Sequence, residues 1–102
     1  MNGIESIDAE RQRQITDLDV TDAGDDTMTQ GELAGAAAAY ALATVDTGDD
    51  ELNRQLDIAA AIAWPWPDFP MKPKDRRRNL VKAGALIVAE IDRLDRMEGG
   101  DA

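Results

Sequence analysis

A long amphipathic pattern near the C-terminus sets the architecture that this chain can adopt. Its apolar positions are spaced alternately by four and three residues: Leu80, Gly84, Ile87, Ile91 and Leu94. This spacing predicts one helix from about residue 74 to residue 97, with its apolar seam facing the protein core. Two consecutive glycines at positions 99 and 100 favour the end of the helix at this point. We expect a helix of this length to form the central element of a helical domain.

Three further helical patterns precede this segment, and no credible strand pattern occurs. The three patterns cover about residues 6–18, 29–43 and 49–63. Together with the C-terminal pattern they predict an all-α fold, a small single-domain bundle of three to four helices. We expect this single domain to span residues 1–102, with residues 1–5 and 98–102 frayed.

Local signals mark several helix boundaries. Thr29 and Glu32 have the spacing of a capping box, which predicts Thr29 as the N-cap of the second helix. Three acids at 49–51 would lie at the positive end of the third helix and favour its start there. Three prolines within residues 65–70 exclude regular helix between the third and last patterns. The Asp-rich stretch 17–26 predicts a solvated connection.

The residue types that the chain lacks narrow its chemistry. It contains no cysteine and no histidine, which removes thiolate and imidazole metal ligands and the Ser–His and Cys–His nucleophile pairs. We therefore predict a protein that is not an enzyme and that carries no metal and no cofactor. No stretch reaches the roughly 18 apolar residues of a membrane span, and the N-terminus lacks the features of a signal peptide. We expect a cytoplasmic protein without a membrane partner.

Charge is divided unequally along the sequence. Residues 1–68 contain fifteen acids and three bases, residues 69–102 contain six acids and eight bases, and the net charge is −10. Direct binding of nucleic acid is not expected, because its phosphates would meet like charge. The acids of two connections instead either imitate phosphate spacing and bind a basic groove of a partner protein, or form a solvated surface. The candidate partner-binding residues are Asp17, Asp19, Asp22, Asp25, Asp26, Asp46, Asp49, Asp50 and Glu51.

A second candidate site combines a basic cluster with two tryptophans. Six cations and one acid lie between Lys72 and Lys82, at the predicted start of the last helix. Cations there are disfavoured by about 0.3–1 kcal/mol each, so the cluster suggests an anion, either an external phosphate or the chain's own acidic connections. The tryptophans either stack a nucleotide base or seal the core. The candidate anion- and nucleotide-binding residues are Trp64, Trp66, Lys72, Lys74, Arg76, Arg77 and Arg78.

The same region carries a family resemblance. The sequence runs from Trp64-Pro65-Trp66 through Lys72-Pro73-Lys74-Asp75-Arg76-Arg77-Arg78 into the last helix, and residues 10–15, 31–34 and 40–41 extend the pattern to about half of the chain. This pattern resembles small phage and prophage accessory proteins of unassigned function, and it is more weakly similar to the ryanodine-receptor-type repeat, a small helical module. Where such proteins usually carry Gly-Trp-Thr after the first helix, this chain has Asp19-Val20-Thr21. The resemblance implies a phage origin and the cytoplasm of a bacterial host cell.

The acidic surface and the resemblance together predict a phage-derived, non-catalytic counter-defence inhibitor. It would bind a host nucleic-acid-binding defence complex as a nucleic-acid mimic, in the manner of an anti-CRISPR protein. One alternative is a nucleotide-binding module that sequesters a host signalling nucleotide through the Trp-Pro-Trp segment and the basic helix start. Another is a magnesium-dependent nucleotide pyrophosphohydrolase built on the carboxylate pairs Glu5/Asp8 and Asp92/Asp95. A homodimer through the alanine-rich second helix is also open.

Overall fold

The computed structural model describes residues 1–17 and 22–99. Within these residues the chain forms five helices and no strand. The helices are α1 (Gly3–Asp17), α2 (Asp22–Asp26), α3 (Glu32–Leu42), α4 (Asp50–Ala63) and α5 (Arg76–Gly99). The prediction of a small all-α domain with a long C-terminal helix is confirmed. None of the described helices is both long enough and apolar enough to cross a membrane.

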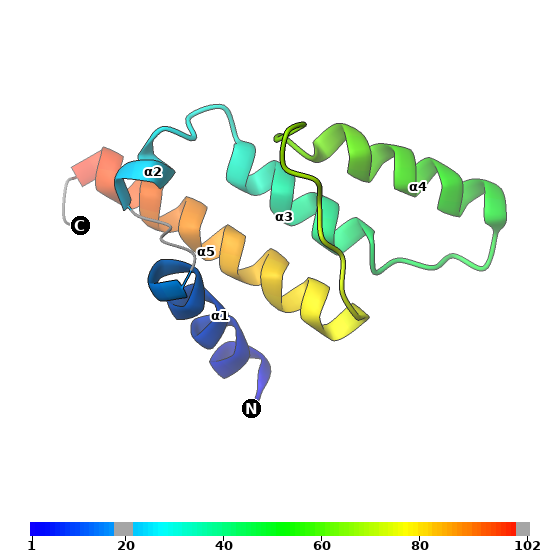
Figure 1. The fold of residues 1–102 in the computed structure, drawn as a ribbon, viewed down its shortest axis with the longest axis horizontal. Helices are drawn as coiled ribbons and strands as arrows, with labels where there is room; N and C mark the ends of the chain where they lie inside the picture. The colour runs from blue at the N-terminus through cyan, green and yellow to red at the C-terminus, as the bar shows by residue number, and fades with distance from the viewer. Residues whose placement is uncertain (18–21, 100–102) are drawn as a thin grey trace.

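α5 lies at the centre of the arrangement (Figure 1). α1 packs on one side of α5 and α3 packs on another side, while the single-turn α2 contacts the C-terminal part of α5. α4 packs against α3 and forms an outer layer. The segment between α4 and α5 returns across α3 (Figure 1), where the Lys72 amide donates to the Tyr40 hydroxyl.

Side-chain caps fix where α4 and α5 begin. Asp49 has extended backbone angles, and its carboxylate accepts a hydrogen bond from the Leu52 amide at 2.9 Å. Asp75 plays the same part before α5, where its carboxylate accepts from the Arg78 amide at 2.8 Å. α4 ends at Trp64, whose backbone is extended and which precedes Pro65. The acids at 49–51 and the proline-rich break therefore mark these boundaries as the sequence predicts.

The start of α3 differs from the prediction. Its N-cap is Gly31, with a left-handed φ of 81°, and no side chain caps the helix. Glu32 accepts a hydrogen bond from the Gln30 amide at 2.6 Å instead of reaching back to Thr29. Glycine adopts this φ without a steric penalty, so the chain turns into α3 two residues later than a Thr29 cap would allow. The capping-box prediction is wrong.

The acidic stretch after α1 is also more ordered than predicted. Residues Asp22–Asp26 form α2, and the Thr27 hydroxyl donates to the Gly24 carbonyl at 2.7 Å at its end. Two arginines from other helices hold α2 in place, because Arg11 pairs with Asp25 and Arg96 pairs with Asp26. A solvated connection is therefore the wrong description of residues 22–26.

Small side chains form much of the core. The buried apolar residues of α3 and α5 are Leu33, Ala36, Ala37, Ala39, Tyr40, Val81, Ala83, Ala85 and Ala89. The central cluster contains Ala37, Tyr40 and Ala83, with Trp64 and Leu86 packed against it. Alanine side chains on both α3 and α5 permit close approach of the two backbones, so the alanine-lined faces of these helices pack against each other.

The predicted core-facing seam of the last helix is correspondingly exposed. Its four large members are between 42 and 51% exposed: Leu80, Ile87, Ile91 and Leu94. The neighbouring stripe of Val81, Ala85 and Ala89 is buried instead. The seam prediction is wrong because periodicity identifies an apolar face of a helix but not what covers it.

We expect Gly35→Ala to destabilise the fold. A Cβ at this position would stand 2.5 Å from the Ala63 carbonyl oxygen, where the start of α3 meets the end of α4. Overpacking of this kind costs about 1–3 kcal/mol, and the gain in helix propensity offsets at most about 1 kcal/mol of it. Urea denaturation followed by circular dichroism measures the change. Gly3→Ala is the matched control, because no atom lies within 4 Å of its Cβ position. An unchanged midpoint for Gly35→Ala would contradict the close α3–α4 contact.

Candidate functional site

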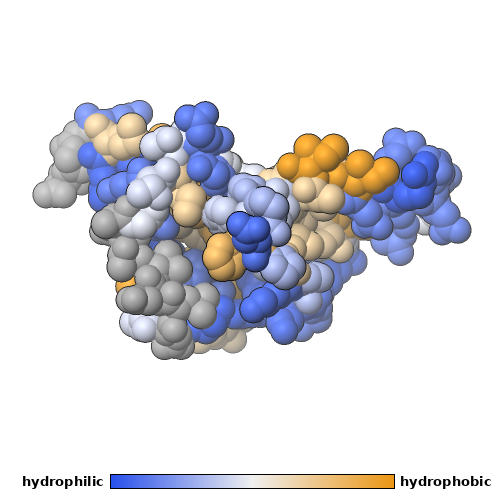
Figure 2. Space-filling view, turned by 45° about the horizontal axis from the view of Figure 1, so that its top comes forward, coloured by the Kyte–Doolittle hydropathy of each residue, from blue (hydrophilic) through white to orange (hydrophobic). Residues whose placement is uncertain are grey.

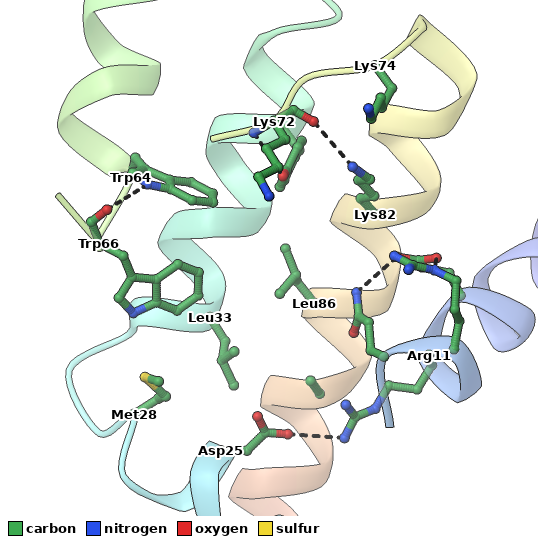
Figure 3. Close-up of a pocket in the computed structure, with 15 residues that line it drawn as sticks. Arg11, Asp25, Met28, Leu33, Trp64, Trp66, Lys72, Lys74, Lys82 and Leu86 are labelled. Atoms are coloured by element: carbon green, nitrogen blue, oxygen red, sulfur yellow. Dashed lines mark hydrogen bonds and ion pairs between the residues drawn. The ribbon is translucent and has the colours of Figure 1, made fainter. Parts of the chain in front are cut away.

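A pocket of about 470 Å³ lies where α1, α3, α5 and the Trp-Pro segment meet (Figure 3). Its size is within the range of small-ligand sites, about 300–1,000 Å³. Five cations, two acids and three aromatic rings line it: Arg11, Arg13, Lys72, Lys74 and Lys82; Glu10 and Asp25; Tyr40, Trp64 and Trp66. Met28, Leu33 and Leu86 add apolar surface. Cations thus predominate around one cavity of a protein whose net charge is −10.

The two tryptophans have different roles in this wall. The Trp64 indole N–H donates to the carbonyls of Trp66 at 3.0 Å and Phe69 at 2.7 Å, which holds the proline-rich segment in its turn. The Trp64 ring packs edge-on against Tyr40, at 5.7 Å between centroids, and belongs to the core. Trp66 packs perpendicular to Trp64 at 5.2 Å and borders the pocket (Figure 3). Trp64 therefore seals the core, whereas Trp66 is the ring best placed to contact a ligand.

Three lysines of the pocket are positioned by contacts with α3 and α5. The Lys72 amide donates to the Tyr40 hydroxyl at 3.4 Å, and the Lys74 amide donates to the buried Asn79 side chain at 2.7 Å. Lys82 donates from Nζ to the Lys72 carbonyl at 3.2 Å and lies 5.2 Å from the Tyr40 ring centroid, a cation–π distance. Burial lowers the pKa of Lys82, and the nearby charge of Arg78 lowers this pKa further. The lysines therefore crowd one side of the pocket with positive charge.

Arg11 is the most informative side chain in the pocket. It is only 5% exposed, and its Nη2 donates to the Asp25 carboxylate at 3.2 Å. Its Nε and Nη1 have no hydrogen-bond partner among the described residues. A buried donor left without a partner costs about 1–3 kcal/mol, and more for a charged group. Two unused, buried and positively charged donors at the wall of a cavity match the requirements of an anion.

Glu10 joins α1 to α5 behind this wall. It is 2% exposed, and its carboxylate accepts from Arg13 Nε at 2.8 Å, from Arg13 Nη2 at 2.9 Å and from Arg78 Nη2. Burial alone would raise the pKa of Glu10, but the hydrogen bonds from Arg13 and Arg78 outweigh it, and the pKa lies below its ordinary value. Glu10 is therefore charged and fully engaged in holding two helices together.

The structure brings four of the seven predicted anion-site residues to the pocket. They are Trp64, Trp66, Lys72 and Lys74. The three arginines lie elsewhere: Arg78 pairs with Glu10, and Arg77 donates to the Ser6 hydroxyl at 2.7 Å. Arg76 is exposed, and its charge helps to lower the pKa of Asp46 after the larger effects of the Asn53 and Gly48 hydrogen bonds. The hydrogen-bond partners of Arg77 and Arg78 thus come from the N-terminal segment rather than from the acidic connections.

Three pocket cations were not recognised from the sequence as site residues. Lys82 belongs to the basic cluster and follows Arg78 by one helical turn, so its helical spacing was an available signal. Arg11 is four residues from both Ile7 and Ile15, and a charged residue between apolar ones at helical spacing is a sign of a buried polar contact. Arg13 had no comparable signal.

The predicted acidic partner site is divided between two places. Asp25 is 3% exposed beside Arg11, and Asp26 accepts from Arg96 at 2.8 Å. Asp19 and the side chains of Asp17 and Asp22 lie outside the described residues. The second group lies in the turn before α4 and in the first turn of α4, well separated from α2 (Figure 1): Asp46, Asp49, Asp50 and Glu51.

The acids of the second group are exposed, although some also shape the turn. Asp46 accepts from the Gly48 amide and from the Asn53 side chain, both at 2.9 Å, and these two contacts lower its pKa. Asp49 caps α4, and Glu51 accepts from Arg54, which lowers the pKa of Glu51. Asp50 projects from the first turn of α4. This turn is the part of the predicted acidic surface that remains open to a partner.

Metal chemistry finds no support in the described part of the chain. No group of three or more His, Cys, Asp or Glu side chains there is arranged to hold a metal ion.

No family model, no curated protein and no solved structure matches this chain. The phage resemblance therefore stays a prediction.

We expect the Glu10 network to make stability depend on pH below the ordinary glutamate pKa of 4.5. Because folding lowers this pKa, Glu10 stabilises the fold above pH 4.5, and the contribution is lost as the pH falls through the folded-state value. Glu10→Gln should lower the free energy of unfolding at neutral pH by roughly 1–3 kcal/mol and weaken its fall between about pH 5 and pH 3. Denaturant titrations at several pH values measure both effects. Asp8→Asn, an exposed change on the same helix, is the control. Equal pH dependence in both variants would contradict the assignment.

Proposed function

We propose that the protein binds a small nucleotide-like anion in the pocket and does not transform it. One observation supports this proposal most strongly. Five of the eleven cations of an acidic chain surround a single cavity that two tryptophans and a tyrosine also line. A positively charged wall beside aromatic rings is the arrangement that holds a phosphate together with a stacked base.

The phosphate would occupy the cationic side of the cavity. Lys72, Lys74 and Lys82 gather at one end of the cavity, whereas Arg11 lies at the other end beside Asp25 (Figure 3). Hydrogen bonds between charged groups are roughly twice as strong as neutral ones, and they strengthen where water is excluded. An anion beside the lysines would offset the repulsion from Arg78, which adds to the effect of burial in lowering the pKa of Lys82.

The flat part of the ligand would lie against Trp66. Leu33, Leu86 and Met28 continue the apolar surface around this ring (Figure 3). Stacking of a base on an aromatic side chain contributes about 1–3 kcal/mol and tolerates different bases. The pocket thus favours a nucleotide over a bare phosphate and over an uncharged nucleoside.

The side chains present favour binding without turnover. The chain has no histidine, and both pocket carboxylates accept hydrogen bonds from arginines. Carboxylates are the most common general bases in a chain without histidine, and Glu10 and Asp25 are already engaged by arginines. With the resemblance to phage accessory proteins, this chemistry suits a protein that sequesters a signalling nucleotide of a bacterial host.

Isothermal titration calorimetry with AMP, a cyclic dinucleotide, ADP-ribose, adenosine and inorganic phosphate tests the proposal. We expect at least one nucleotide to bind with micromolar or better affinity and to outcompete both adenosine and phosphate. Trp66→Ala should weaken this binding by roughly 5- to 150-fold through lost stacking. Lys82→Gln should weaken it by about tenfold or more through a lost charge-assisted hydrogen bond.

Two matched substitutions serve as controls. Phe69→Ala removes an aromatic side chain that is 72% exposed and does not line the pocket, and Arg54→Gln removes a cation from the distant face of α4. Both should bind the nucleotide as the unchanged protein does. Failure of every nucleotide to bind at millimolar concentration, or equal losses in Trp66→Ala and Phe69→Ala, would overturn the proposal.

The acidic turn before α4 supports a second candidate, the counter-defence inhibitor that mimics nucleic acid. Asp50 and Glu51 are exposed there and neither caps a helix, so they can be changed without loss of the α4 cap. The test uses bacteria whose defence system restricts a phage. If the acidic residues bind the defence complex, the double change Asp50→Lys, Glu51→Lys should abolish the ability of this protein to protect the phage. If nucleotide sequestration protects the phage, Trp66→Ala should abolish protection while the acidic double variant retains it.

A further inference from the structure

An apolar seam with charged ends runs along the exposed side of α5. Leu80, Ile87, Ile91 and Leu94 are each about half exposed, at 48, 49, 51 and 42%. At 100° per residue, these four positions fall within roughly 60° of arc on the helix surface. Arg76 and Glu98 fall within the same arc, at opposite ends of the helix, and both are exposed. The seam therefore reads cation, four large apolar residues and anion along one line.

Gly84 contributes no side chain to the seam, and Ile7 of α1 fills the space above it. Gly84 occupies the heptad position between Leu80 and Ile87, and a Cβ there would lie 2.5 Å from Cδ1 of Ile7. Ile7 of α1 thus packs over the glycine beside the line of exposed residues. The alternating steps of four and three residues are the spacing by which two helices pack side by side.

We propose that a second copy of the chain docks on this seam with its α5 antiparallel. With the two-fold axis at Ile87, Leu80 of one copy faces Leu94 of the other, because both lie seven residues from the axis. Arg76 lies eleven residues before the axis and Glu98 lies eleven residues after it, so each Arg76 meets a Glu98 of the second copy. A parallel pair would instead place Arg76 beside Arg76 and Glu98 beside Glu98, so charge complementarity selects the antiparallel arrangement.

This inference does not depend on the nucleotide proposal. α5 contributes Lys82, Leu86 and Ala89 to the pocket, and these residues lie on a different side of the helix from the seam. The docked pair would leave both pockets open. It also differs from a dimer through the alanine-rich α3, whose buried residues already pack against α4 and α5.

A second apolar patch provides a matched control. Figure 2 shows apolar side chains gathered over α4, where Ile58 and Ile62 are 47 and 79% exposed. This helix has acids in its first turn but no base in its last turn, so it lacks the complementary ends of the α5 seam. A polar change on α4 alters the same kind of exposed side chain outside the proposed interface.

Sedimentation equilibrium over a range of protein concentrations tests the proposal. The unchanged chain should approach the dimer mass as concentration rises, Ile87→Asp should stay at the monomer mass, and Ile62→Asp should dimerise normally. Ile87 is half exposed, so the variant should keep its helical circular dichroism. A monomer mass for the unchanged chain at millimolar concentration, or loss of the dimer in Ile62→Asp alone, would overturn the proposal.

Engineered cysteines test the antiparallel register, because the chain contains no cysteine of its own. Ile87→Cys should form a disulfide with its own copy under mild oxidation. Leu80→Cys should not do so, since 14 residues of axial offset separate the two sites by about 21 Å. A mixture of Leu80→Cys and Leu94→Cys should give the mixed disulfide. Efficient self-linking of Leu80→Cys would overturn the antiparallel arrangement.

Charge exchange tests the pairing at the ends of the seam. Arg76→Glu and Glu98→Arg should each weaken dimerisation several-fold, because each places like charges together in an antiparallel pair. The double variant should recover dimerisation, since it restores the same pairs with their signs reversed. Additive losses in the double variant would overturn the proposed Arg76–Glu98 contact.

Discussion

The polar face of α1 determines how the rest of the molecule is arranged. α1 docks through the buried side chains of Ser6, Glu10, Arg11 and Gln14, while Ile4 and Ile15 remain 82 and 40% exposed. Burying such groups is favourable only when their hydrogen bonds are satisfied, and Glu10 achieves this with Arg13 and Arg78. The consequence is an inverted distribution of side chains. Charged groups gather inside the α1–α5 contact, and large apolar groups stay on the outer faces of both helices.

This distribution places cationic side chains around a pocket whose remaining surface is largely apolar. Asp25 occupies one edge of the Arg11 guanidinium, and the other donors meet no partner among the described residues. Buried donors without a partner are few in native folds, so the Nε and Nη1 of Arg11 mark this part of the pocket. Three lysines and Trp66 also line the cavity, and together these groups are the basis of the proposed anionic, aromatic ligand.

Two boundaries set by signals within a few residues were readable from the sequence, whereas contacts between distant segments were not. One local signal was misread, the capping-box spacing of Thr29 and Glu32, because Gly31 turns the chain into α3 without a side-chain cap. The start of α4 at its acidic turn and the break after Trp64 depend on local backbone chemistry, and both follow the sequence. The face of α5 that is buried depends instead on competition between two stripes. The alanine stripe wins because it permits close packing, and hydropathy gives it little weight against leucine and isoleucine. For the site, Trp64 to Lys74 form one continuous segment that sequence could delimit. Lys82 could have been added from its helical spacing in the basic cluster, whereas Arg11 and Arg13 of α1 join the site through tertiary packing.

α1 borders both the candidate pocket and the proposed docking seam. Arg11 on this helix borders the pocket, and Ile7 packs over Gly84 beside the seam. Because a helix moves as a nearly rigid body, a displacement of α1 that changes the Arg11 contacts also moves Ile7 along α5. Glu10 lies between these residues and ties α1 to Arg78, so it limits both movements at once. If a ligand in the pocket and a second copy on the seam each favour a particular position of α1, the two binding events are coupled, and by linkage each changes the affinity for the other by the same factor.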